Sequence, residues 1–194
     1  MAYSKRRTWK DCKDEKILAI YNEVLEEAKR LYPTYFTTKL HFYLNNSTSH
    51  LGCCVGELDR NTVYSKWGFR NHFENLRWKE AAIIISKYVT DLKMIRATII
   101  HEMAHFVTPN EHHSGCWLAR ANKIGEKWKI KSNRAATDEE SVAFRKNITQ
   151  KMKYKVICSG CGRIVTRTRM CNIIEHPELW KCGECGAHFK AFEN

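Results

Sequence analysis

Two Cys-x-x-Cys pairs near the end of the chain constrain its fold more than any other feature. Cys158 and Cys161 form the first pair, Cys182 and Cys185 form the second, and twenty residues separate them. The thiolates of each pair can converge in a tight turn, and two such turns build a closed tetrahedral site of four sulfur ligands. A closed site of this kind binds structural zinc. The spacing therefore predicts a four-cysteine zinc ribbon, which we place at residues 151–194.

A glycine follows the second cysteine of each pair. Gly162 follows Cys161 and Gly186 follows Cys185. Such turns often need a positive φ, which glycine adopts without steric cost. We therefore expect a positive φ at both glycines.

The number of cysteines and the expected location of the protein both bear on whether the cysteines form disulfides. The chain has nine cysteines, an odd number that suits a disulfide framework poorly. Its first residues are basic and lack an apolar segment behind them, and no run of eighteen apolar residues occurs. We therefore expect no secretory signal, no membrane span and an intracellular location, cytoplasmic or nuclear depending on the host. In such a compartment cysteines serve more often as metal ligands or free thiols than as disulfides.

A second metal motif lies in the middle of the chain. His101, Glu102 and His105 form a His-Glu-x-x-His sequence inside an apolar pattern of helical period. Residues four apart on a helix share one face, so both imidazoles can reach one zinc ion. Glu102 can then act as general base toward water at the open coordination position. This constellation predicts a catalytic zinc and is far more typical of peptidases than of nucleases.

A catalytic zinc usually has three protein ligands and one open position. The third ligand must therefore come from outside the motif. His112 and His113 both follow in the next loop, and either can fold back onto the metal. The spacing alone leaves this choice open.

The first 150 residues have the pattern of an α+β domain. Leu92, Ile95, Ile99, Ile100, Met103 and Phe106 form the predicted buried stripe of the helix that carries the motif. The stretch 131–153 is polar and charged, and we interpret it as a connector that is partly helical. The further predicted elements are a helix at 11–31 with a start signal at Thr8, strands near 40–44, 51–55, 62–67 and 81–86, and helices from 91 to 109 and from 115.

The chain is strongly basic, with 33 Lys and Arg against 21 Asp and Glu and a net charge of +12. Such an excess favours polyanionic partners, above all nucleic acid. Within the expected ribbon, basic side chains suited to phosphate lie near an aromatic side chain suited to base stacking. The candidate nucleic-acid-binding residues are Arg163, Arg167, Arg169, Trp180 and Lys181.

These motifs, taken in order, resemble the SprT-like (Spartan-like) zinc metalloprotease family. A strand-like IIIS run precedes the helix LKMIRATIIHEMAHF, His113 lies four residues before Trp117 ahead of ARANKIG, and the ribbon closes with WKCGECG. The resemblance covers roughly residues 18–189. One departure is that Ser114 separates His113 from Gly115, where the family usually has His-Gly.

The resemblance implies a zincin-like domain at 1–150, in which helices pack on a small sheet. It also implies His113 as third zinc ligand, because its spacing to Trp117 matches the family pattern. Members of the family hydrolyse peptide bonds, and the best-known ones cleave proteins crosslinked to DNA in a DNA-dependent manner. The expected partners are thus DNA, single-stranded or partly so, and protein substrates. The expected cofactors are one catalytic and one structural zinc ion.

We expect the substrate to lie extended along an edge strand of the sheet, for which the 81–86 run is a candidate. Two alternatives to a DNA-directed protease remain. A non-catalytic zinc protein would bind nucleic acid without cleavage that depends on Glu102. A DNA-independent metallopeptidase would cleave at a rate that DNA does not change.

Overall fold

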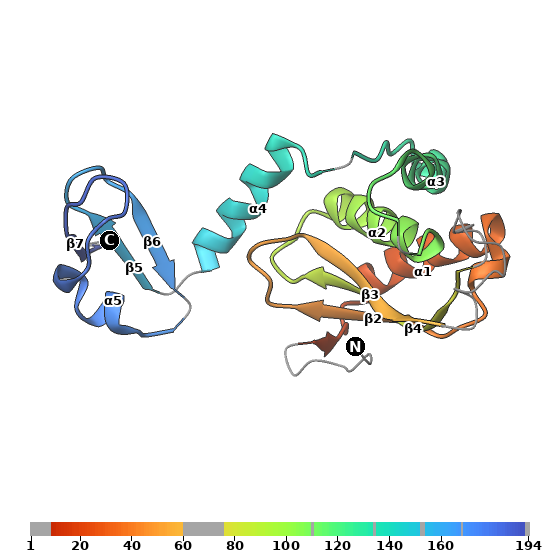
Figure 1. Cartoon of the computed structure of the whole chain (residues 1–194), viewed down its shortest axis with the longest axis horizontal. Coiled ribbons are helices and arrows are strands. Elements are labelled where there is room, and N and C mark those ends of the chain that lie inside the picture. Colours follow the sequence, from red (N-terminus) through yellow and green to blue (C-terminus); the bar gives the residue numbers. More distant parts are fainter. Residues whose placement is uncertain are drawn as a thin grey trace, which may run out of the picture. The chain divides into compact units, whose positions relative to one another are not determined.

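The computed structural model describes residues 9–59, 76–109, 111–133, 135–151, 154–167 and 169–192. The chain divides into two compact units, Met1–Phe144 and Arg145–Asn194. Each unit combines helices with a small sheet, so the predicted mixed α and β composition is confirmed (Figure 1). The strand expected at 62–67 lies outside the described residues.

The first unit contains a four-stranded sheet in the order β1-β2-β4-β3 (Figure 1). β1 (Lys10–Asp11) is antiparallel to β2 (Leu40–Asn45), and β2 is parallel to β4 (Trp78–Ser86). β3 (Gly52–Leu58) pairs antiparallel with the other side of β4. β4 is therefore an inner strand, and the expectation that the 81–86 run lies at the edge is wrong. In the sheet that the described residues form, β3 is an edge strand.

The first helix begins later than its apolar pattern predicted. α1 spans Glu15–Leu31, and the Asp14 side chain caps it by accepting hydrogen bonds from the backbone N–H groups of Lys16 and Ile17. This cap replaces the start predicted near Thr8, because residues 10–11 are extended and pair with β2. The helix ends at Leu31, before Pro33.

The helix that carries the His-Glu-x-x-His motif is α2 (Leu92–Val107). Its cap is Asp91, whose carboxylate accepts from the backbone N–H of Met94 at 2.7 Å. α2 packs on β3 and β4 and contacts α1 and α3 (Gly115–Gly125) (Figure 1). The predicted apolar stripe is buried except for Leu92, which is 46% exposed because it starts the helix.

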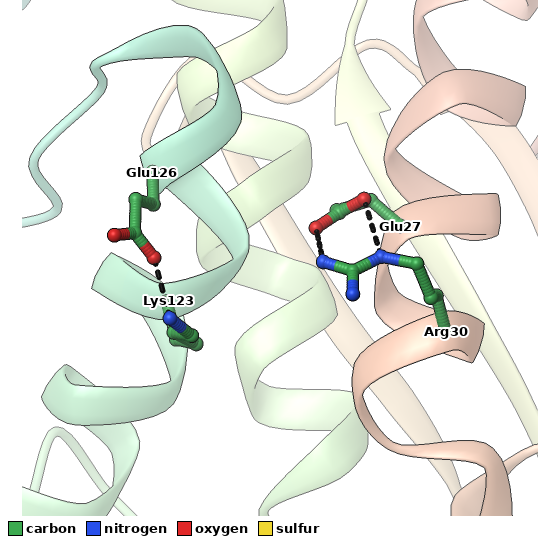
Figure 2. A network of polar contacts seen from close by, with 4 residues as sticks. All are labelled: Glu27, Arg30, Lys123 and Glu126. Carbon is green, nitrogen blue, oxygen red and sulfur yellow. Dashed lines mark hydrogen bonds and ion pairs between the residues drawn. The ribbon is translucent and has the colours of Figure 1, made fainter.

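Two ion pairs, one on α1 and one at the end of α3, join charged side chains that are three residues apart in sequence. Figure 2 shows Arg30 bonded to both carboxylate oxygens of Glu27, and Lys123 bonded to Glu126. The Lys123 Nζ–Glu126 Oε2 distance is 2.6 Å. Glu27 is buried, and its hydrogen bond with Arg30 lowers the pKa of the carboxyl group. Exposed ion pairs are screened by solvent and contribute little to stability. Arg30 and Lys123 therefore already have carboxylate partners.

The second unit contains three strands, β5 (Tyr154–Cys158), β6 (Ile164–Arg167) and β7 (Phe189–Ala191). They form an antiparallel sheet in the order β6-β5-β7. The predicted positive φ is confirmed at Gly162 and Gly186, both at 72°. The stretch expected as a partly helical connector contains helix α4. None of the described helices has the length and apolarity needed to cross a bilayer.

The other described elements of the two units are η1 (Pro33–Tyr35), η4 (Glu126–Trp128), α4 (Asp138–Lys151), α5 (Asn172–Glu175) and η5 (Pro177–Leu179).

Candidate metal centres

Three histidine side chains from α2 and the loop after it meet at one point. His101 and His105 lie one turn apart on α2, and His113 lies in the loop just before α3. The Nε2 atom of His113 is 2.9 Å from Nε2 of His101 and 3.2 Å from Nε2 of His105. His112 is exposed and is not part of this group. Of the two candidates for a third ligand, the structure therefore brings His113 to the motif.

The spacing of these nitrogens fits a shared cation. Ligand distances of about 2.0–2.1 Å at a tetrahedral zinc place two ligand nitrogens about 3.3 Å apart. A single Nε2 carries either one N–H or one lone pair, so it forms one linear hydrogen bond at most. The two close neighbours of the His113 nitrogen thus exceed what hydrogen bonding explains, whereas a metal ion between three lone pairs explains both. The group can hold a metal ion.

The surroundings of His101 and His105 keep their imidazoles neutral. The pKa of His101 is lowered to about 3, first by burial and then by repulsion from protonated His105 and His113. The pKa of His105 is lowered to about 4, again mainly by burial. Neutral imidazole is the form that binds metals, so the His101 and His105 side chains are in the binding state at neutral pH.

Backbone groups orient two of the rings. His101 forms a hydrogen bond with the backbone of Asn133, and His105 forms one with the backbone of Glu111. The loop that carries Asn133 is fixed by a 2.9 Å hydrogen bond from the backbone N–H of Ser132 to Asn122 Oδ1. Such outer contacts fix the ring orientation and the tautomer of metal-binding histidines. Sequence reasoning missed them, because no residue type is required of a backbone partner.

Trp117 of α3 lies against all three imidazoles. Its ring centroid is 4.6 Å from those of His101 and His113 and 5.1 Å from that of His105. The Trp117 side chain is fully buried, and it packs with Ala104 and Ala121 between α2 and α3. This rigid aromatic wall restricts the rotamers of the three rings. Sequence reasoning used Trp117 for its spacing to His113 and did not reveal this contact.

Glu102 points toward the edge strand of the sheet. Its side chain is 6% exposed, and burial raises the pKa of its carboxyl group to about 8. A hydrogen bond from the backbone N–H of Cys54 partly opposes this shift by stabilising the carboxylate. In its ionised form, a carboxylate with a raised pKa is a stronger base than an ordinary exposed carboxylate.

The four predicted ribbon cysteines form a second group. The Sγ atoms of Cys158 and Cys185 are 3.4 Å apart, those of Cys161 and Cys182 are 3.7 Å apart, and all four lie within 4.8 Å of one another. Zinc–sulfur distances of about 2.3 Å place tetrahedral thiolates about 3.8 Å apart. Hydrogen bonds, the largest from the backbone N–H of Cys161, lower the pKa of Cys158 and favour its thiolate, whereas the neighbouring thiols raise the pKa of Cys161. This group can also hold a metal ion.

The residues predicted to bind nucleic acid are exposed on the same unit. Trp180 is 47% exposed, and Arg167, Arg169 and Lys181 are exposed as well. Arg163 forms an ion pair with Glu184, which reduces its free charge. Three cations and one aromatic side chain thus remain available on the surface.

Comparisons with protein-family models, with curated proteins and with solved structures found no match.

The first prediction concerns the third ligand. His113→Ala should weaken binding of one of two metal ions by more than about 100-fold, because loss of a direct ligand costs more than loss of an outer contact. His112→Ala is the matched control, because the His112 imidazole is next to His113 in sequence but is exposed and outside the group. Zinc affinity is measured by competition with a chromophoric chelator. Equal affinities of the two variants would refute the assignment of His113.

Proposed function

We propose that this protein is a zinc-dependent endopeptidase of the zincin type, similar to the SprT-like proteases, that cleaves proteins bound or crosslinked to DNA. The observation that carries the proposal is that three imidazoles meet at one point, and that α2, which supplies two of them, also carries the buried carboxylate of Glu102. Three histidines leave a coordination position open for chemistry, whereas four thiolates close a site. The proposed protease unit therefore holds the catalytic zinc, and the ribbon holds the structural zinc.

When bound, zinc would supply Lewis acidity, which makes water more acidic and polarises the scissile carbonyl. His101, His105 and His113 would hold it. Glu102 accepts the proton of the attacking water and later delivers it to the leaving amine. A carboxylate can take both roles, because it accepts a proton in its ionised form and donates one in its protonated form.

The substrate in this proposal lies along β3. This strand is at the edge of the described sheet, and its first residue lies against the Glu102 side chain. An extended peptide that adds to β3 through backbone hydrogen bonds would therefore pass beside the general base. Backbone pairing reads little sequence, which suits a protease with many protein targets.

The ribbon in this proposal recruits the enzyme to DNA. Its exposed cations suit phosphate, and Trp180 suits stacking on a base of single-stranded or partly single-stranded DNA. Selectivity then comes from location and not from a preferred cleavage sequence.

The second prediction tests the DNA part of the proposal. The zinc-loaded protein should cleave a protein crosslinked to single-stranded DNA faster than the same protein without DNA. A variant with Arg167→Ala, Arg169→Ala and Lys181→Ala should lose this stimulation. The slope of its log affinity for DNA against log salt concentration should also fall, by the amount expected for about three lost phosphate contacts. Cleavage is followed on gels and binding by fluorescence anisotropy at several salt concentrations.

Cleavage that is equally fast with and without DNA would support the peptidase activity and refute the proposal that the ribbon recruits the enzyme to DNA. Tight DNA binding without any cleavage would favour the non-catalytic zinc protein instead.

A further inference from the structure

The first residue of β3 approaches the motif helix unusually closely. A Cβ atom built on Gly52 would lie 2.8 Å from Thr98 Cγ2, 3.1 Å from Glu102 Cγ and 3.1 Å from Glu102 Oε1. Real Cβ atoms essentially never come within 3.0 Å of another heavy atom. The φ of Gly52 is not in the positive range. The position therefore requires glycine for space and not for backbone conformation.

The neighbouring methyl group has little freedom to move away. Thr98 is 6% exposed, and its hydroxyl donates to the carbonyl of Met94 at 2.8 Å. This hydrogen bond fixes the side-chain rotamer that directs Cγ2 at Gly52. Thr98 and Glu102 are four residues apart, so both lie on the face of α2 that meets β3.

A second contact from the same strand reaches the carboxylate. Cys54 lies two residues after Gly52, so both positions face the same side of the sheet. The backbone N–H of Cys54 donates to the Glu102 carboxylate. The close approach at Gly52 and the hydrogen bond at Cys54 thus act on one side chain.

We propose that Gly52 is a positioning residue for the general base: its missing side chain lets α2 approach β3 closely enough for the Cys54 amide to hold the Glu102 carboxylate. This inference rests on the proposed peptidase function. It makes the edge strand both the substrate-binding strand and the support of the base. A methyl group at position 52 would displace the carboxylate without touching the three imidazoles.

The third prediction separates positioning from simple packing. Gly52→Ala should lower Tm by roughly 3–10 °C, because it overpacks the interface, and should lower kcat by about 100-fold, because a base displaced by about 1 Å acts poorly. Adding Thr98→Ser removes the methyl group at 2.8 Å but keeps the hydroxyl. The double variant should regain most of the Tm but not the kcat. KM and zinc content should stay near those of the parent in both variants.

Gly115→Ala is the matched control, because a Cβ there meets nothing within 4 Å. It should keep the parental Tm and kcat. A double variant with parental kcat would overturn the proposal, since Gly52 would then only accommodate Thr98.

One readout does not depend on activity. In NMR spectra of the labelled, zinc-loaded full chain, the Cys54 amide resonance of the double variant should move toward its position in Glu102→Ala. An unchanged Cys54 resonance would overturn the positioning role even if the parent cleaved no protein. Absence of parental cleavage together with the expected shift would instead refute the peptidase function and keep the contact.

Discussion

Cys182→Ser is expected to unfold the C-terminal unit, residues 145–194, and to release one of two metal ions. Cys182 is 3% exposed and belongs to the small core of this unit, with Val156, Cys158 and Phe189. A core of this size supplies little stability by itself, and small units usually need a metal or disulfides to fold. All nine cysteines are free thiols, so the four-thiolate group is the available cross-link. Structural zinc in such peptides contributes about 10–16 kcal/mol of apparent binding free energy.

The measurement is amide hydrogen exchange of β5, β6 and β7, with metal content measured on the same sample. Amides of these strands should lose nearly all protection, whereas those of α2 and β4 should keep it. Cys171→Ser is the matched control, because Cys171 lies in the same unit but outside the metal group. Retained protection and two bound metal ions in Cys182→Ser would show that the thiolates do not hold this unit together.

The sequence predicted elements well where local signals agreed. The apolar period of residues 92–106 favoured α2, and the observed helix starts directly after Asp91. The start of α1 was misplaced because apolar period alone does not exclude pairing with a distant strand. Asp14 offered a stronger cap than Thr8, and that signal was available in the sequence.

Strand order was the least predictable part of the fold. The position of β4 depends on pairing with β2 and β3, which are distant in sequence. One local signal was nevertheless present, because Ala81–Ile85 is apolar at every position. An edge strand with one solvated face alternates, whereas a strand buried on both faces does not. All five side chains are 0–1% exposed, as that reading requires.

The candidate site divides in the same way. The spacing within one helix was enough to predict that His101 and His105 lie together. The Cys-x-x-Cys spacing was likewise enough to predict that the four ribbon cysteines lie together. The contacts of Trp117, Asn133, Gly52 and Cys54 depend on how α2, α3, β3 and the loop after α3 pack. Backbone partners and a missing side chain leave no chemical signature in a single sequence, so these contacts required the structure.

Glu102→Gln is expected to lower the rate of peptide-bond cleavage by about 10²–10⁴-fold while both metal ions stay bound. The substitution keeps the size of the side chain but removes the group that accepts and returns a proton. The imidazoles are unchanged, so the metal affinity of their group should remain. Glu126→Gln is the matched control, because that carboxylate is exposed and pairs only with Lys123 among the contacts of Figure 2.

The most direct test compares the parent, Glu102→Gln and Glu126→Gln, each loaded with zinc and shown to hold two ions per chain. All three are incubated with a protein crosslinked to single-stranded DNA, and new N-termini are counted by mass spectrometry. We predict new N-termini with the parent and Glu126→Gln, and almost none with Glu102→Gln. Cleavage by Glu102→Gln at the parental rate, with zinc retained, would contradict the assignment of this protein as a metallopeptidase that uses Glu102 as its base.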